Sequence, residues 1–127
     1  MLEKLQMYIN GEWVDSHSTE TIEVMNPSDD SVLGVITAGN ADDVDAAVSA
    51  AKDAFADFGF STKEERVKIL ENIIEEYEKR SEELAETISR EMGAPIWLSQ
   101  VAQVASGLTH FKDCLLYTSD AADEFSC

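Results

Sequence analysis

The sequence predicts an α/β protein in which an N-terminal β-ribbon and a strand precede four amphipathic helices. Three observations support this prediction. Short β-favouring runs separated by turn signals lie before residue 38. From Asn40 onward the hydrophobic pattern changes to a helical period of about 3.6 residues. The chain has 127 residues, of which 44% are hydrophobic, a size and composition typical of at most one folded domain.

The β-favouring runs form three segments. Residues 6–15 contain the pair Asn10-Gly11, which tolerates positive φ and either divides the segment into a short hairpin or kinks one continuing ribbon. Residues 21–25 alternate polar and apolar side chains, as a half-buried strand does. Residues 26–30 form a turn with proline, and the aliphatic run at residues 31–38 predicts a third strand.

The first helix is expected to begin after Asn40, a good N-cap residue, and to end at Gly59. Aspartates follow the cap, where the helix dipole favours negative charge. Apolar residues then repeat at spacings of four and three and form one stripe: Val44, Val48, Ala51, Phe55 and Phe58. The alanines between them allow a neighbouring element to approach this helix closely.

Three further helices are predicted after residue 60. The second begins at Ser61 or Thr62, each followed three residues later by Glu in the capping-box pattern. The third is expected to be capped by Ser81 and to stop at Gly93, and the fourth to start at Pro95. The predicted inward-facing stripes are Val67, Leu70, Ile74 and Tyr77 in the second helix, Leu84, Ile88 and Met92 in the third, and Trp97, Val101, Val104, Leu108 and Phe111 in the fourth. Each stripe needs an apolar surface to pack against.

The charge balance excludes two classes of partner. Asp and Glu number 26 against 9 Lys and Arg, for a net charge of -17. Nucleic-acid binding and attachment to anionic membranes both need clustered basic residues, so neither is expected. No apolar run is long enough for a transmembrane helix, and no secretory signal pattern is found at the start, so a cytoplasmic location is expected.

The end of the chain looks foreign to the rest. Residues 114–124 closely resemble the in-frame translation of a transposase adapter used in sequencing libraries. The alternative is an ordinary helix end followed by a polar tail. On the first interpretation residues 114–127 are an assembly scar and residues 1–113 are the natural part of a fragment. Both cysteines, Cys114 and Cys127, fall in this tail and therefore do not indicate a redox compartment.

No motif with its own chemistry is evident from the residues alone. The glycines are too scattered for a dinucleotide-binding loop, and no zinc or calcium pattern occurs. His17 is expected to be a solvated surface residue, and His110 a packing residue beside Phe111. The Glu-rich stretch at residues 71–86 is interpreted as a solvated helix face. On these grounds we predict no catalytic residue.

The ordered set of segments nonetheless resembles one family. Residues 8–14, 22–28, 32–36, 42–55, 65–73 and 84–95 are similar, in order and spacing, to the opening of the NAD(P)-dependent aldehyde dehydrogenase superfamily. The resemblance covers residues 7–113. It implies that residues 1–113 are an incomplete part of a Rossmann-like cofactor-binding domain, in which the helices cover the cofactor-binding sheet.

The resemblance also implies an activity for the intact protein. Members oxidise an aldehyde to a carboxylic acid with NAD or NADP, through a cysteine thiohemiacetal and thioester that a glutamate-activated water hydrolyses. They usually form homodimers or homotetramers. The positions of the family's cysteine, glutamate and cofactor-binding residues lie beyond Asp113. The resemblance therefore implies an inactive fragment with no catalytic or cofactor-binding residue of its own.

One minor site is implied within the chain. Some members bind a monovalent cation through backbone oxygens and an acidic side chain, and the matching positions are Val24, Met25 and Glu91. Oxygen ligands suit a hard ion, although Glu91 stands where Asp is usual in the cation-binding members. We therefore predict a sodium or potassium site formed by these three residues.

Two hypotheses for function follow. In the first, the chain is the N-terminal, structural piece of an aldehyde dehydrogenase. In the second, it is a free-standing acidic helical module that folds alone and binds a basic or amphipathic partner without catalysis. The second accounts for the charge and the four stripes, but it leaves the ordered segments to coincidence.

Overall fold

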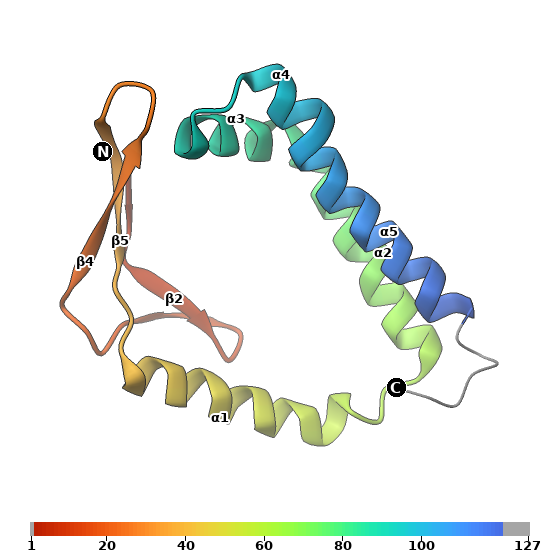
Figure 1. The fold of residues 1–127 in the computed structure, drawn as a ribbon. Coiled ribbons are helices and arrows are strands. Elements are labelled where there is room, and N and C mark those ends of the chain that lie inside the picture. Colours follow the sequence, from red (N-terminus) through yellow and green to blue (C-terminus); the bar gives the residue numbers. More distant parts are fainter. Residues whose placement is uncertain (1, 121–127) are drawn as a thin grey trace. The chain divides into compact units, whose positions relative to one another are not determined.

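The computed structural model describes residues 2–120 and divides the chain into two compact units, one up to Phe60 and one from Ser61 (Figure 1). Among the helices of residues 2–120, none has the length and apolar character that crossing a membrane requires. The N-terminal unit has the element order β1 (Leu2–Lys4), β2 (Gln6–Ile9), β3 (Glu12–Asp15), β4 (Thr21–Asn26), β5 (Ser31–Thr37) and α1 (Ala41–Phe58).

Strands β2 and β3 form an antiparallel hairpin. Of the two alternatives that the sequence left open for residues 6–15, the structure therefore has the short hairpin and not the kinked ribbon. Asn10 and Gly11 make the turn with φ values of 54° and 81°, as a two-residue primed turn requires. Tyr8 and Trp13 face each other across the strands, with ring centroids 5.3 Å apart in an edge-to-face arrangement. The hairpin is therefore fixed by its turn and by one aromatic pair.

The second sheet has the strand order β1-β5-β4. The predicted strands β4 and β5 pair antiparallel, with an irregularity between Val24 and Met25. Strand β1, which the sequence did not predict, pairs parallel to β5 and places Leu2 opposite Gly34. A side chain on Gly34 would collide with the backbone carbonyl oxygen of Leu2, so the close approach of β1 depends on this glycine.

Helix α1 begins and ends as predicted. The side chain of Asn40 accepts hydrogen bonds from the backbone N–H groups of Asp42 and Asp43, and the Asp43 carboxylate accepts one from the backbone N–H of Asn40. The apolar stripe is exposed over much of its length, and Phe55 retains 69% of its accessible surface. Within its own unit, the stripe thus lacks the apolar surface that amphipathic helices need.

The C-terminal unit is helical, with the order α2 (Lys63–Lys79), α3 (Ser81–Met92), α4 (Ile96–Leu98), the π-helix η1 (Ser99–Val104) and α5 (Ala105–Asp120). Thr62 caps α2 and forms a capping box with Glu65, as predicted. The predicted stripe of α2 also faces inward, with Ile74 buried and Tyr77 partly buried. Gly93 ends α3 in the left-handed conformation, with φ of 69°.

The predicted cap of α3 is wrong. Arg80 occupies the N-cap position, and Ser81 is already the first helical residue. The Ser81 hydroxyl donates instead to the carbonyl oxygens of Tyr77 and Glu78 at the end of α2. Because α3 starts directly where α2 ends, the last carbonyl oxygens of α2 lie within reach of this hydroxyl. The hydroxyl bonds them instead of capping the N–H groups of α3.

The predicted stripe of the fourth helix is correct only in its second half. Leu108 and Phe111 are partly buried and Val104 is buried, but Trp97 and Val101 retain 61% and 67% of their accessible surface. Ser99 is fully buried instead. The reason is the π-helix η1, whose wider turn interrupts the period of 3.6 residues on which the prediction rests. Met92, predicted to face inward from α3, is also exposed.

Helix α5 packs along α2, and η1 packs against α3. The rings of Tyr77 and Phe111 lie 5.8 Å apart between α2 and α5, and Lys112 forms an ion pair with Glu78 at 2.8 Å beside them. Ala85 of α3 is completely buried. Helix α5 runs through residue 113 without a break, and residues 121–127 of the tail singled out in the sequence lie outside the described residues.

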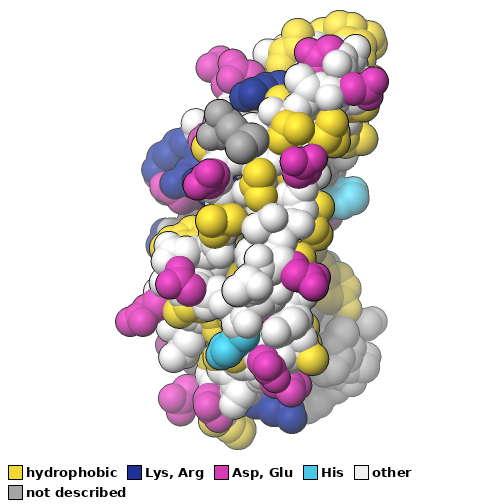
Figure 2. All heavy atoms as spheres, turned by 90° about the vertical axis from the view of Figure 1, so that its left-hand side faces the viewer, with side chains coloured by type: hydrophobic (Ala, Val, Ile, Leu, Met, Phe, Trp, Pro, Cys, Tyr) yellow, Lys and Arg dark blue, Asp and Glu magenta, His cyan; other side chains and the backbone are white. Residues whose placement is uncertain are grey.

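The acidic side chains do not gather in one place on the visible surface. In the face shown in Figure 2, Asp and Glu side chains are scattered among hydrophobic ones. No cluster of three or more His, Cys, Asp or Glu side chains suited to a metal ion occurs within residues 2–120. On this face the acidic side chains are therefore dispersed, as expected for solvated surfaces.

Candidate functional site

The most highly connected polar side chain of the N-terminal unit is Asp43, in the first turn of α1. Its carboxylate is 5% exposed and accepts hydrogen bonds from Ser16 Oγ at 2.6 Å, from the backbone N–H of His17 at 2.9 Å and from that of Asn40 at 3.0 Å. His17 Nδ1 also lies 2.9 Å from the carboxylate. These donors, the Ser16 hydroxyl above all, hold the pKa of the Asp43 carboxyl well below its usual range.

This arrangement is a structural joint rather than a reactive site. All the contacts favour a permanently ionised carboxylate, which neither gives nor takes a proton near neutral pH. The carboxylate links the loop after β3 to the start of α1, where the helix dipole also favours negative charge. The sequence predicted the cap at Asn40 but not the joint, because nothing in the local pattern connects Ser16 and His17 to Asp43.

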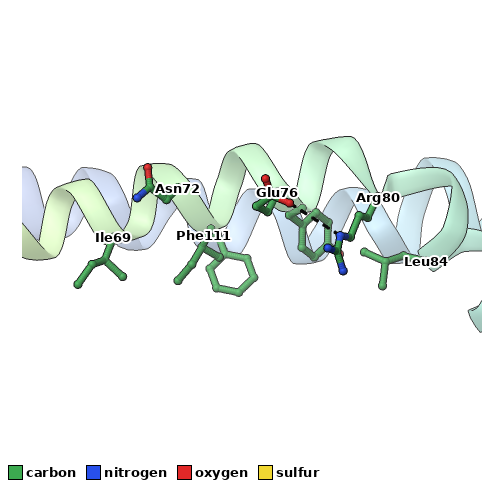
Figure 3. Close-up of a pocket in the computed structure, with 8 residues that line it drawn as sticks. Ile69, Asn72, Glu76, Arg80, Leu84 and Phe111 are labelled. Atoms are coloured by element: carbon green, nitrogen blue, oxygen red, sulfur yellow. Dashed lines mark ion pairs between the residues drawn. The ribbon is translucent and has the colours of Figure 1, made fainter. Parts of the chain in front are cut away.

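The C-terminal unit has an open groove of about 540 Å³ along α2, α3 and α5. Figure 3 shows Ile69, Leu84 and Phe111 projecting to the same side of the helices. The charged groups of this groove, Glu76 and Arg80, pair with each other at 3.8 Å. The full set of lining residues is Ile69, Asn72, Ile73, Glu76, Tyr77, Arg80, Leu84 and Phe111. With its apolar lining and no candidate nucleophile, the groove is suited to packing.

A smaller hollow lies in the N-terminal unit between the hairpin tip and α1. It is lined by Tyr8, Ile9, Asn10 and Gly11 of the hairpin and by Ala47, Ala50, Ala51 and Ala54 of the helix. The sequence predicted that the alanines of α1 let a neighbouring element approach closely; the hairpin lies near this side, but Ala47, Ala51 and Ala54 stay exposed. This hollow offers backbone and methyl groups and no titratable side chain except the Tyr8 phenol.

The residues of the predicted cation site belong to different units. Val24 and Met25 lie next to each other on β4, at the irregularity in its pairing with β5. Glu91 lies in the last turn of α3, exposed, in the C-terminal unit. The backbone oxygens and the carboxylate therefore come from separate bodies, and the cation site stays a prediction.

The two histidines and Cys114 lie at or near the surface. His17 keeps 60% of its side-chain surface and lies against Asp43, so its ring is exposed but anchored. His110 is exposed on α5, whereas a packing role was predicted; only its neighbour Phe111 turns inward. Cys114 is exposed on α5 as a free thiol. Within the described part of the chain, neither His110 nor Cys114 is joined by another group in an arrangement suited to catalysis.

Comparison with known proteins identifies the family. The profile of the aldehyde dehydrogenase family matches residues 13–125. A Staphylococcus haemolyticus protein described as "putative aldehyde dehydrogenase" is 44% identical over 120 residues, which cover 94% of this chain and 24% of that protein. The chain thus spans about a quarter of the length of such relatives.

Solved structures agree with the sequence match. Aldehyde dehydrogenase from Bartonella henselae superimposes with a TM-score of 0.92 and 38% identity over 99% of this chain and 28% of its own. Aldehyde dehydrogenase C from Pseudomonas syringae, solved as a C291A mutant with NAD+ and octanal, gives 0.88 and 36% over 90% of this chain and 24% of its own. These matches support the first of the two hypotheses, a part of a larger enzyme. The chain belongs to the aldehyde dehydrogenase family.

Proposed function

We propose that the full-length protein oxidises an aldehyde to a carboxylic acid, with the added oxygen coming from water, while NAD+ or NADP+ is reduced. The observation that supports this most strongly is the family match over residues 13–125. The Pseudomonas syringae relative was crystallised with NAD+ and octanal, a cofactor and an aldehyde of the proposed classes. The chemistry would follow the family's scheme, with a cysteine nucleophile and a thioester that water hydrolyses.

The residues described here do not fit a dinucleotide. Glycines that cradle phosphates leave their backbone open to the ligand. Here Gly34 faces the backbone of Leu2, Gly39 the side chain of Met7 and Gly107 the ring of Tyr77, while the open Gly11 stands in a hairpin turn that no helix follows. When bound, the nicotinamide supplies the hydride acceptor of the reaction. We infer that other parts of the protein hold it and that this chain alone is inactive.

The proposed role of this chain is to build and cover the domain that binds the cofactor. The stripe of α1 and the apolar groove of the C-terminal unit both expose large side chains, including Phe55, Phe58 and Ile69. Burying one such side chain contributes about 2 kcal/mol relative to leaving it in water. We propose that these surfaces pack against the remaining three-quarters of a full-length enzyme. A homodimer or homotetramer in the cytoplasm is part of the same proposal.

The test is a comparison of two purified proteins. The full-length protein should reduce NAD+ or NADP+ only when an aldehyde is added, as followed by the absorbance of the reduced cofactor. The chain of residues 1–127 should show no turnover with the same aldehydes. Failure of the full-length protein with aliphatic and aromatic aldehydes and both cofactors would contradict the proposed activity.

A monovalent cation bound by Val24, Met25 and Glu91 is also part of the proposal. The pairing irregularity at Val24 and Met25 supports it, because a bulge redirects the backbone groups at its position. Potassium or sodium should then raise the melting temperature of the full-length protein relative to a large organic cation. The Glu91→Gln variant should lose this difference, whereas Glu86→Gln on the same helix should keep it. An equal response in both variants would argue against the site.

We further propose that residues 114–127 are an adapter scar. The support is the resemblance of residues 114–124 to the translated adapter, although the family match extends through residue 125. Sequencing of the source gene across codons 105–127 should show the reading frame departing from this sequence after Asp113. A genomic sequence that encodes Cys114–Cys127 unchanged would refute the scar and favour an ordinary helix end.

A further inference from the structure

The helical segment after Pro95 contains one wide turn between two narrower ones. In a π-helix each N–H bonds the carbonyl five residues earlier, so η1 takes up more residues per turn than α5. Ser99 and Val104, at its two ends, are five residues apart and are both buried, at 0% and 3% exposure. The two ends of the π-helix are thus both fixed in the packing of the C-terminal unit.

The C-terminal end of η1 is anchored on α2 by Tyr77. Its hydroxyl donates a hydrogen bond to the Val104 carbonyl oxygen at 3.0 Å, and its ring packs against Phe111. Gly107 makes room for this contact, because a Cβ atom at that position would collide with the Tyr77 hydroxyl oxygen. This anchor therefore depends on one hydroxyl group and on one missing side chain.

The N-terminal end of η1 is anchored at α3. The buried Ser99 hydroxyl donates to Gln103 Oε1 at 2.9 Å, and Gln103 Nε2 reaches the sulfur of Met92 at 3.7 Å. Ser89 Oγ donates to the Ala94 carbonyl oxygen at 2.6 Å, which ties down the turn before α4. Because both ends of η1 are held, the segment between them contains one residue more than an α-helix would place in the same turn, and the wider π-helical turn accommodates it.

The sequence itself supports a second arrangement. Trp97, Val101 and Val104 are spaced as an uninterrupted α-helical stripe, yet Trp97 and Val101 lie exposed. We propose that residues 99–104 are a register switch, held in the π-helical state by the Tyr77–Val104 anchor. Release of this anchor converts the segment to α-helix and rotates Trp97 about the helix axis by about 100°, one residue of an α-helix. The switch couples the packing of α5 on α2 to the orientation of α4. This inference does not depend on the proposed activity.

The test uses the full-length protein and three variants. Tyr77→Phe removes the hydroxyl but keeps the ring on Phe111, and Gly107→Ala displaces the hydroxyl by collision. Tyr8→Phe, on the N-terminal hairpin, is the matched control. Crystal structures report the hydrogen-bond pattern of residues 99–104, and 19F NMR of protein labelled with 5-fluorotryptophan reports Trp97, whose resonance is assigned by its loss in Trp97→Phe.

Wild type and Tyr8→Phe should keep the five-residue pattern and an unchanged Trp97 resonance. Tyr77→Phe and Gly107→Ala should show the four-residue α pattern and a shifted Trp97 resonance. An α-helix across residues 99–104 in the wild-type protein overturns the proposal. So does Tyr77→Phe with the π pattern intact, even if that variant is less stable, because loss of stability alone indicates an ordinary packing role. Should Gly107→Ala fail to fold, Tyr77→Phe and the wild type still decide the question.

Discussion

Ser16 and Asp43, 27 positions apart in sequence, are joined by a hydrogen bond of 2.6 Å from the serine hydroxyl to the carboxylate. The bond connects the loop after β3 to the first turn of α1. The backbone N–H groups of His17 and Asn40 complete the donors around the same carboxylate. This one side chain therefore fixes where α1 starts relative to the strands of its unit.

The Asp43 joint predicts an acid-sensitive contribution to stability. Because the folded-state pKa of Asp43 is depressed, the stabilisation is fully present above the unfolded-state pKa of about 3.9 and is lost as pH falls through the lower folded value. Asp43→Asn should lower the urea midpoint of the full-length protein at neutral pH. The gap from wild type should shrink only below about pH 4. A gap that is unchanged at acid pH, or already closed near neutrality, would contradict this role.

The cap of α1 predicts a second effect. Asn40→Ala removes the acceptor for two backbone N–H groups and should cost about 1 kcal/mol of stability. Asn40→Ser keeps a capping oxygen and should cost much less. Amide hydrogen exchange over the first turn of α1, compared in the full-length variants, measures the difference. Equal protection in both variants would show that the cap does not stabilise this turn.

The cap of α2 provides a matching prediction in the C-terminal unit. The Thr62 hydroxyl accepts a hydrogen bond from the backbone N–H of Glu65, and the backbone N–H of Thr62 donates one to the Glu65 carboxylate in return. Thr62→Ala should therefore destabilise α2 by about 1 kcal/mol, whereas Thr62→Ser should be nearly neutral. Thr109→Ala, which removes only a hydroxyl bonded to the preceding turn of α5, is the control. Amide hydrogen exchange over the first turn of α2 measures these effects. A loss of protection there as large in Thr109→Ala as in Thr62→Ala would show that the Thr62 cap does not stabilise α2.

Two glycines allow a test of the parallel strand β1. A Cβ atom at position 34 meets the rigid backbone of Leu2, whereas one at position 39 meets the flexible end of the Met7 side chain. Gly34→Ala should thus separate β1 from β5 and expose the amides of β5 to exchange. Gly39→Ala should be tolerated through a rotation of Met7. Similar exchange in the two variants would contradict the proposed close approach of β1.

The sequence predicted those elements whose signals are local. The Asn10-Gly11 turn, the Asn40 and Thr62 caps and the stop at Gly93 depend on residues within a few positions of each other, and all were confirmed. Features that depend on contacts between distant residues were missed. Strand β1 pairs with β5 because Gly34 leaves space for the backbone of Leu2. A strand of three residues is too short for its sequence pattern to indicate such a partner.

The errors have the same origin. Ser81 is of a residue type that often caps helices, but it lies one position after the N-cap of α3. Its hydroxyl donates to carbonyl oxygens at the end of α2 instead. Trp97 and Val101 match an α-helical stripe, but contacts of Tyr77 with Val104 and of Ser99 with Gln103 hold a π-helix there. Periodicity predicts the inward face only where a helix keeps its period.

The central claim is that this chain supplies covering elements whose apolar faces need the rest of an aldehyde dehydrogenase. Urea unfolding of residues 1–113 alone, followed by far-ultraviolet circular dichroism, tests it most directly. We expect a broad, shallow transition, because the exposed stripe of α1 and the open groove along α2 leave little buried apolar surface to unfold cooperatively. A monomeric fragment with a single steep transition would instead show that these residues form a self-sufficient domain.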